Sequence, residues 1–178
     1  MKVKKITFAQ FLQLEGDEYE LYKRIGLSMK PDAWQVSDVL DWDFITVKKV
    51  QSIILQTYDY QTFINVAGML TGQSVEKILS KIWFDVFAFH NFVTEQIDHV
   101  NELEEKLIYE PSADEEKAGI EQFSQFGYFA TVDRLAGGDV TKYDTVGAVD
   151  YATIYTKLLL NRIDGEYHER LIEIKTKR

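Results

Sequence analysis

The chain has no cysteine and only three histidines among its 178 residues. Without cysteine it can form no disulfide framework, zinc ribbon, thiolate nucleophile or iron–sulfur cluster. No G-x-S-x-G sequence is present, and so few histidines leave little choice of a base for a hydrolase triad. We therefore predict no catalytic residue, no cofactor-binding or metal-binding residue and no cofactor, and we expect that the protein is not an enzyme.

Long hydrophobic runs are also missing. The densest apolar run, 82–93, is interrupted by Asp85 and His90 and is too short to span a bilayer. The basic first residues resemble the start of a signal peptide, but the apolar stretch behind them breaks at once. We expect a soluble protein with no membrane partner.

Positive charge is scarce in the body of the chain. The formal net charge is -9, and an acidic body repels phosphate backbones, which argues against a sequence-specific nucleic-acid partner. The basic ends are the exception: they could touch an acidic neighbour or nucleic acid, or serve only as solubilising terminal charge. These basic ends are Lys2, Lys4, Lys5, Lys175, Lys177 and Arg178.

What the chain does have is helical periodicity and enough apolar residues, 46%, to bury a full core. In the segment 74–109 apolar residues recur every three or four positions, which predicts one helix about 54 Å long at 1.5 Å per residue. Strand-like alternation never extends beyond a few residues, apart from a possible small β element near 3–6. We predict an all-α fold, an elongated irregular helical bundle built around this one long central helix.

Short local signals divide the rest of the chain. Pro31 makes 29–33 the clearest loop, so we predict an N-terminal helical arm, 1–32, and a helical body, 33–178, with a single domain overall as the alternative. Ser112 and Glu115 form a capping box at a new helix start. After it, we expect Phe123 and Phe126 to face inward.

Three groups of polar residues are weighed as sites. Glu95, His99 and Glu102 share one side of the predicted long helix, but their His-x-x-Glu order is the reverse of the Glu-x-x-His order in di-iron proteins. We therefore interpret them as a solvent-exposed helix face. The alternative function, a cytoplasmic helical metalloenzyme, would use these three residues as metal ligands. His90, among aromatics, is expected to be a core or interface histidine. The segment 135–142 lacks the order of a phosphate loop and is expected to be an interhelix turn capped by its aspartate.

Aromatic side chains are the remaining signal. Most must belong to the core, but tryptophan and tyrosine are also enriched at subunit interfaces. We predict interface anchors at aromatic residues near the proline loop and near Gly127: Trp34, Trp42, Phe44, Phe126 and Phe129.

Parts of the C-terminal third, namely 113–120, 126–127, 132–139 and 151–155, together resemble small structural or assembly proteins of tailed bacteriophages, in particular crAss-like phages of gut Bacteroidetes. The resemblance includes no catalytic signature. It implies a virion protein, assembled in the host cytoplasm.

Two roles follow from this resemblance and stay open. One is a ring or adaptor component of the head-to-tail connector, in which copies pack side by side and contact portal or tail components. The other is an assembly chaperone or scaffold that the virion does not retain. A long helix with apolar residues on more than one face favours a homo-oligomer, because a small bundle cannot cover so much apolar surface by itself.

Overall fold

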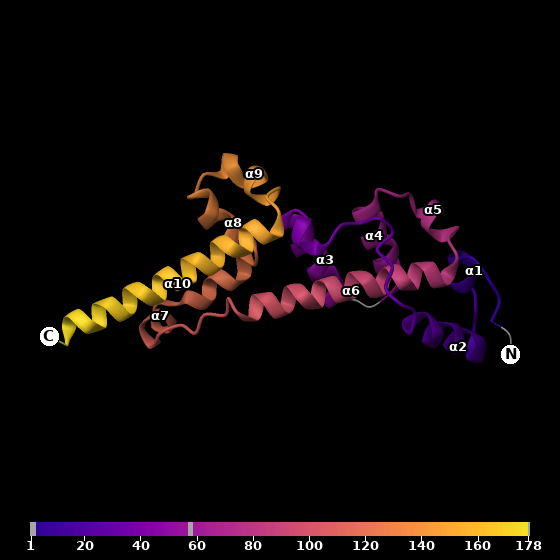
Figure 1. Ribbon diagram of the computed structural model, residues 1–178, viewed down its shortest axis with the longest axis horizontal. Helices are drawn as coiled ribbons and strands as arrows, with labels where there is room; N and C mark the ends of the chain where they lie inside the picture. Colours follow the sequence, from indigo (N-terminus) through magenta and orange to yellow (C-terminus); the bar gives the residue numbers. More distant parts are fainter. Residues whose placement is uncertain (1–2, 57–58, 178) are drawn as a thin grey trace. The chain divides into compact units, whose positions relative to one another are not determined.

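The structure, a computed structural model, describes residues 3–56 and 59–177. Within these ranges the only β pairings are two isolated bridges, and all other regular structure is helical (Figure 1). The predicted all-α class is confirmed. The helices are α1 (Phe8–Phe11), α2 (Gly16–Leu27), η1 (Val39–Asp41), α3 (Phe44–Gln56), α4 (Tyr60–Thr71), α5 (Val75–Leu79), α6 (Trp83–Glu105), α7 (Ala113–Ala118), η2 (Ile120–Phe126), α8 (Phe129–Ala136), η3 (Val140–Lys142), α9 (Tyr143–Gly147) and α10 (Tyr151–Thr176).

The chain divides into two compact units, which do not follow the predicted boundary at residue 32. The first unit comprises 1–38 and 49–99, and the second comprises 39–48 and 100–178. Residues of the expected arm, such as Phe8, are fully buried in the first unit. No described helix is long and apolar enough to cross a membrane.

The predicted long helix is broken between α5 and α6, so the prediction of one unbroken helix over 74–109 is wrong. The amide of Phe8 donates to the carbonyl of Lys81 (2.8 Å), and the amide of Trp83 donates to the carbonyl of Ile6 (3.1 Å). These long-range bonds use backbone groups that a continuous helix would need for itself. The small β element expected near 3–6 is reduced to a single bridge between Thr7 and Ile82.

The long helix also ends earlier than predicted, at Glu105. Three consecutive amides beyond it, of Lys106, Leu107 and Ile108, bond to carbonyls three residues back. Such i→i−3 bonds tighten the last turn and use up carbonyls that α-helical bonds would otherwise accept. The chain then leaves helical geometry before Pro111.

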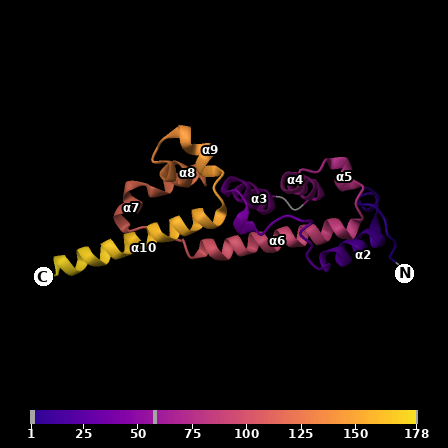
Figure 2. The ribbon, with the colours of Figure 1, turned by 45° about the horizontal axis from the view of Figure 1, so that its top comes forward.

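The first unit is built on aromatic packing around α6. Helices α2 and α4 flank the first part of α6 (Figures 1 and 2). Phe11 stacks on Tyr19 at 5.5 Å and meets the edge of Phe87 at 5.3 Å between ring centroids. Gly26 of α2 is required here, because a Cβ on it would lie 2.5 Å from the Phe87 ring. The tyrosines among these rings pair with each other, because the hydroxyl of Tyr19 donates to that of Tyr60 (2.9 Å).

The core of the second unit is smaller and includes polar contacts. Phe44 stacks on Tyr151, and Tyr151 donates its hydroxyl to Glu104 (2.7 Å). Lys48 forms an ion pair with the same carboxylate. Burial, followed by the bond to Glu104, raises the pKa of Tyr151. One carboxylate therefore joins α3, α6 and α10.

Candidate interaction surface

Three phenylalanines at the surface of the second unit form what we call the aromatic surface: Phe123, Phe126 and Phe129. Their exposed fractions are 64%, 55% and 51%. Phe123 and Phe126 lie three residues apart in η2, and residues at this spacing point the same way in a 3₁₀-helix. The expectation that Phe123 and Phe126 face inward is therefore wrong. Phe129 follows in α8 and stacks on Tyr128 at 4.6 Å.

The aromatic surface is presented on a short, sharply bounded segment. Gly127, at φ 52° and ψ -134°, ends η2 in a backbone conformation that favours glycine. A 3₁₀ run as long as η2 is uncommon, because its side chains eclipse and its hydrogen bonds are poor. The three rings are more than half exposed, so contacts within this chain do not explain why phenylalanine stands at these positions.

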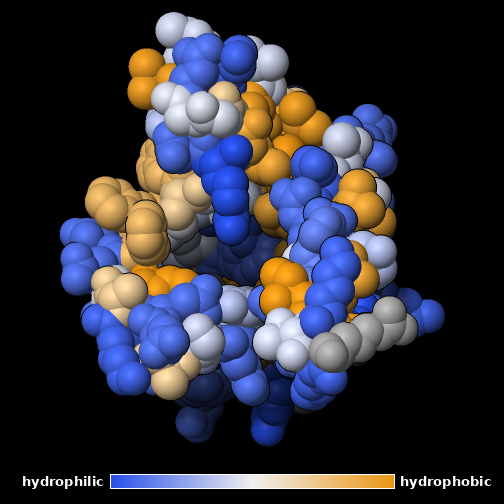
Figure 3. All heavy atoms as spheres, turned by 90° about the vertical axis from the view of Figure 1, so that its left-hand side faces the viewer, coloured by the Kyte–Doolittle hydropathy of each residue, from blue (hydrophilic) through white to orange (hydrophobic). Residues whose placement is uncertain are grey.

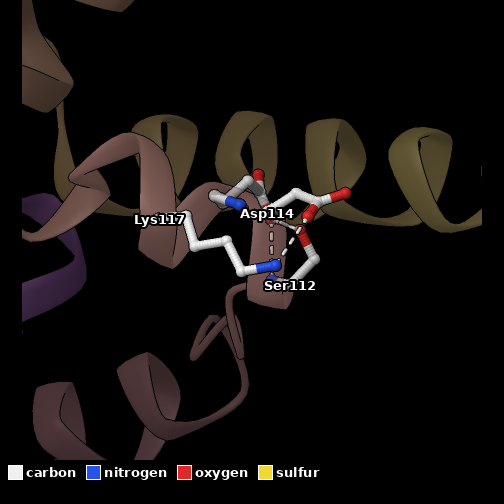
Figure 4. Close-up of polar contacts among 4 residues, drawn as sticks. Ser112, Asp114 and Lys117 are labelled. Carbon is white, nitrogen blue, oxygen red and sulfur yellow. Dashed lines mark hydrogen bonds and ion pairs between the residues drawn. The ribbon is translucent and has the colours of Figure 1, made fainter.

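The start of α7, just before this segment, is held by the capping box that the sequence predicts. The Glu115 carboxylate accepts from the amide and hydroxyl of Ser112, both at 2.8 Å, and from Tyr109 at 2.7 Å. The bond from Tyr109, followed by those from Ser112, lowers the pKa of Glu115. Figure 4 shows Ser112 beside the pair of Asp114 and Lys117, which are 3.5 Å apart.

The second exposed apolar feature is a row of side chains along α10, which we call the α10 stripe. Near its N-terminus α10 buries Tyr151 and Ile154 in the second unit. The stripe begins nine residues after Tyr151, which is two and a half helical turns and places it on the opposite side of the helix. Apolar residues are visible among polar ones from the side that shows the C-terminal end of α10 (Figure 3). The stripe consists of Leu160, Ile163, Tyr167, Leu171 and Ile174.

Exposure confirms that the stripe is uncovered. The exposed fractions of Leu160, Ile163, Tyr167 and Ile174 lie between 52% and 57%, and Leu171 is half-buried. From the sequence, a helix end near Asp164 and Gly165 and a separate polar tail helix over 166–175 are predicted, but the structure continues α10 through Gly165. A glycine inside a helix costs only about 1 kcal/mol, so it did not mark a boundary here. The stripe residues follow one another at steps of three or four positions on both sides of Gly165, and this spacing is the sequence signal that predicts a continuous apolar face.

The five predicted anchors separate into three groups, which are buried, half-buried and exposed. Trp42 and Phe44 are buried, with 6% and 1% exposed, so neither side chain is available at the surface. Trp34 is half-buried, since it stacks on Phe89 at 4.4 Å between ring centroids and lies under Lys81. Phe126 and Phe129 are exposed and belong to the aromatic surface.

The three polar candidates of the long helix are surface residues. Glu95, His99 and Glu102 are exposed on successive turns of α6, and within 3–56 and 59–177 no three histidine, aspartate or glutamate side chains are placed to hold a metal ion. Asp139 caps the turn after α8 through Thr141, as expected for an interhelix turn.

His90 is a core histidine, as predicted. Its ring stacks on Phe63 at 3.5 Å, and its Nε2 lies 3.5 Å from the hydroxyl of Thr94. Burial lowers the pKa of His90 from 6.5 to about 4, so the ring is neutral near pH 7. It lines a small hollow in the first unit together with apolar side chains, among them Val66, Val86 and Val93. Among the described residues, none of those that line the hollow is charged near pH 7.

Comparison with known proteins found no matching family model, no similar curated protein and no similar solved structure.

Proposed function

We propose that the protein is a non-enzymatic assembly component of a tailed phage that binds copies of itself and other virion proteins. The observation that supports this proposal best is the exposure of the aromatic surface. Monomeric proteins seldom expose several large apolar side chains together, and where they do, the surface commonly binds a partner. Phenylalanine is among the residue types enriched at interfaces.

The role that we favour is a ring or adaptor protein of the head-to-tail connector, with portal or tail components as neighbours. The residues that carry the phage resemblance, in 113–120, 126–127 and 132–139, include Phe126 and lie on both sides of Phe123 and Phe129. A ring requires two different surfaces on each copy, one for each neighbour. The aromatic surface would supply one of them, and no cofactor or sequence-specific nucleic-acid contact is needed.

The acidic charge of the chain, formally -9, agrees with this role. A negative channel wall would not grip passing DNA, because like charges repel. In such a ring the protein would be located in the virion, after assembly in the host cytoplasm.

The test is binding to purified portal and tail proteins, measured by light scattering after size-exclusion chromatography. The variant is Phe126→Ala combined with Phe129→Ala, and the control is Val140→Ala, which removes another apolar side chain, 69% exposed, from the same unit. We expect the double variant to lose the complex and the control to retain it. Equal binding by both variants would exclude the aromatic surface as the contact.

Virion composition separates this role from that of an assembly chaperone. Mass spectrometry of purified virions should find the chain in stoichiometric amounts if it is a ring protein. A chain that binds a tail component during assembly but is absent from the finished particle would contradict the ring and identify a chaperone.

A further inference from the structure

We infer that the α10 stripe is a self-association surface whose occupant is the same stripe of a second copy, running antiparallel. The inference stands apart from the proposed function, because it rests on α10 alone and requires no phage partner. It is carried by two features of the helix, the spacing of the apolar residues and the order of the charged ones.

The spacing of the stripe is symmetric about its middle residue. Leu160 and Ile163 precede Tyr167 by seven and four positions, and Leu171 and Ile174 follow it by four and seven. The mean step of 3.5 residues is that of a helix seam that faces another helix. An antiparallel copy centred on Tyr167 therefore places Leu160 opposite Ile174, and Ile163 opposite Leu171, along about 21 Å of helix.

The charges beside the stripe have the order that this orientation needs. Asp164 and His168 lie 3.4 Å apart on one flank, and Glu166 and Arg170 lie 3.7 Å apart on the other. On each flank an acidic residue precedes Tyr167 and a basic one follows it. Arg162, which also pairs with Glu166 (2.8 Å), donates to the carbonyl of Lys106 and so lies toward the body of the unit, away from the stripe. In a two-fold antiparallel pair each flank faces the same flank of the second copy. Asp164 of one copy therefore lies within one helical turn of His168 of the other, and Glu166 of one copy within one turn of Arg170 of the other.

The parallel orientation fails the same charge criterion. In a parallel pair the two different flanks face each other at equal height. Asp164 of one copy would then lie near Glu166 of the other, and His168, which carries a charge only when protonated, near Arg170. Like charges at such positions oppose pairing, so the charge order selects the antiparallel copy.

The helix also contains a matched control for the stripe. Ile172, with 64% of its side chain exposed, lies nine residues after Ile163 and therefore on the opposite side of α10. Ile163→Glu and Ile172→Glu thus make the same chemical change at similar exposure on one helix. Only the first would bury a carboxylate in the contact, twice per pair because of the symmetry.

The first experiment is sedimentation equilibrium of the full chain over two decades of concentration. We expect reversible dimerisation that Ile163→Glu weakens at least a hundredfold and that Ile172→Glu leaves within about threefold. Circular dichroism of both variants checks that α10 stays helical. A wild-type chain that is monomeric throughout, or equal effects of the two variants, would overturn the inference without affecting the portal and tail binding tested above.

The second experiment fixes the orientation, using the absence of native cysteine. Leu160→Cys and Ile174→Cys chains are oxidised separately and as a mixture. The antiparallel pair predicts disulfide formation mainly in the mixture, because two copies of residue 160 would lie about 21 Å apart, far beyond disulfide reach. Efficient crosslinking of each variant with itself, and none between the two, would show a parallel pair and overturn the inference.

Discussion

The two compact units differ in what they do with their apolar residues. The first unit encloses its aromatic rings, with Phe8, Phe11 and Phe87 fully buried. The second leaves the three rings of the aromatic surface and most of the α10 stripe more than half exposed. Within its described residues the first unit also exposes apolar side chains, such as Leu27 and Val75, but none of them is as exposed as the three rings of the aromatic surface. The larger exposed apolar side chains of the second unit make it the better candidate for a partner.

The polar groups follow the same division. His90, buried in the first unit, is neutral near pH 7 because burial lowers its pKa to about 4. The second unit instead includes Glu104 in its core, bound by Lys48 and Tyr151. Stability in the first unit comes chiefly from packing. In the second unit it depends in part on charge and hydrogen bonds.

The largest expected effect is that of Phe87→Ala in the first unit. Phe87 meets Phe8, Phe11 and Phe63 edge to face, and removing a buried phenylalanine ring typically costs about 3–5 kcal/mol of unfolding free energy. Urea unfolding followed by tryptophan fluorescence measures the loss. A loss below about 1 kcal/mol would show that the first unit does not have the closed core described here.

Acid is expected to destabilise the first unit through His90. Its pKa is about 4 in the folded protein, down from 6.5, so between pH 6.5 and 4 the unfolded chain binds a proton that the folded chain does not. Unfolding free energy should therefore fall as the pH drops through this window, by about 3 kcal/mol in total, with no further loss from this group below pH 4.

The His90→Leu variant isolates that contribution from the titration of carboxylates. Unfolding free energies of both proteins, measured by urea titration from pH 7.5 to 4, should converge or cross as the pH falls, because only the wild type loses the histidine contribution. Parallel pH profiles would contradict a buried, neutral His90.

Glu104→Ala should destabilise the second unit by about 2 kcal/mol, because the half-buried Lys48 loses its ion pair and the buried Tyr151 hydroxyl loses its acceptor. Tyr151→Phe removes only the hydroxyl and should cost about 1 kcal/mol. Thermal melts of the two variants give the order of the effects. If Tyr151→Phe were the more damaging change, Glu104 would not be the group that joins the three helices.

The smallest expected effect is that of Phe129→Ala in dilute solution. Half of this side chain is already exposed, so truncation should change unfolding free energy by about 0.5 kcal/mol or less. Comparing the losses of unfolding free energy in Phe87→Ala and Phe129→Ala therefore distinguishes a buried ring from an exposed one. A loss comparable to that of Phe87→Ala would mean that the aromatic surface is interior.

Local signals in the sequence were sufficient for the helix class and for several helix ends. The capping box of Ser112 and Glu115 forms as predicted, and Gly72 and Gly137 end α4 and α8 in the left-handed conformation. Each of these depends on groups within a few residues, so the chemistry is visible in the sequence itself.

Long-range contacts explain what the sequence did not predict. The break before α6 is made by backbone bonds to Ile6 and Phe8, which no periodicity near residue 80 could indicate. Trp42 is buried because η1 and the start of α10 meet, with the amide of Tyr151 bonded to the carbonyl of Trp42. Of the predicted anchors, Phe126 and Phe129 are the two whose exposure leaves them free to act as such.

Hydroxyl-radical footprinting read by mass spectrometry tests most directly that the second unit, and not the first, contains the contact surfaces. In dilute protein we predict fast labelling of Phe126, Phe129 and Tyr167 and slow labelling of Phe11 and Phe87. On concentration Tyr167 should become protected, and on addition of a bound portal or tail protein Phe126 and Phe129 should follow, while the first unit is unchanged. Fast labelling of Phe11 and Phe87 in dilute protein, or labelling of the second unit that stays the same under all these conditions, would contradict the account.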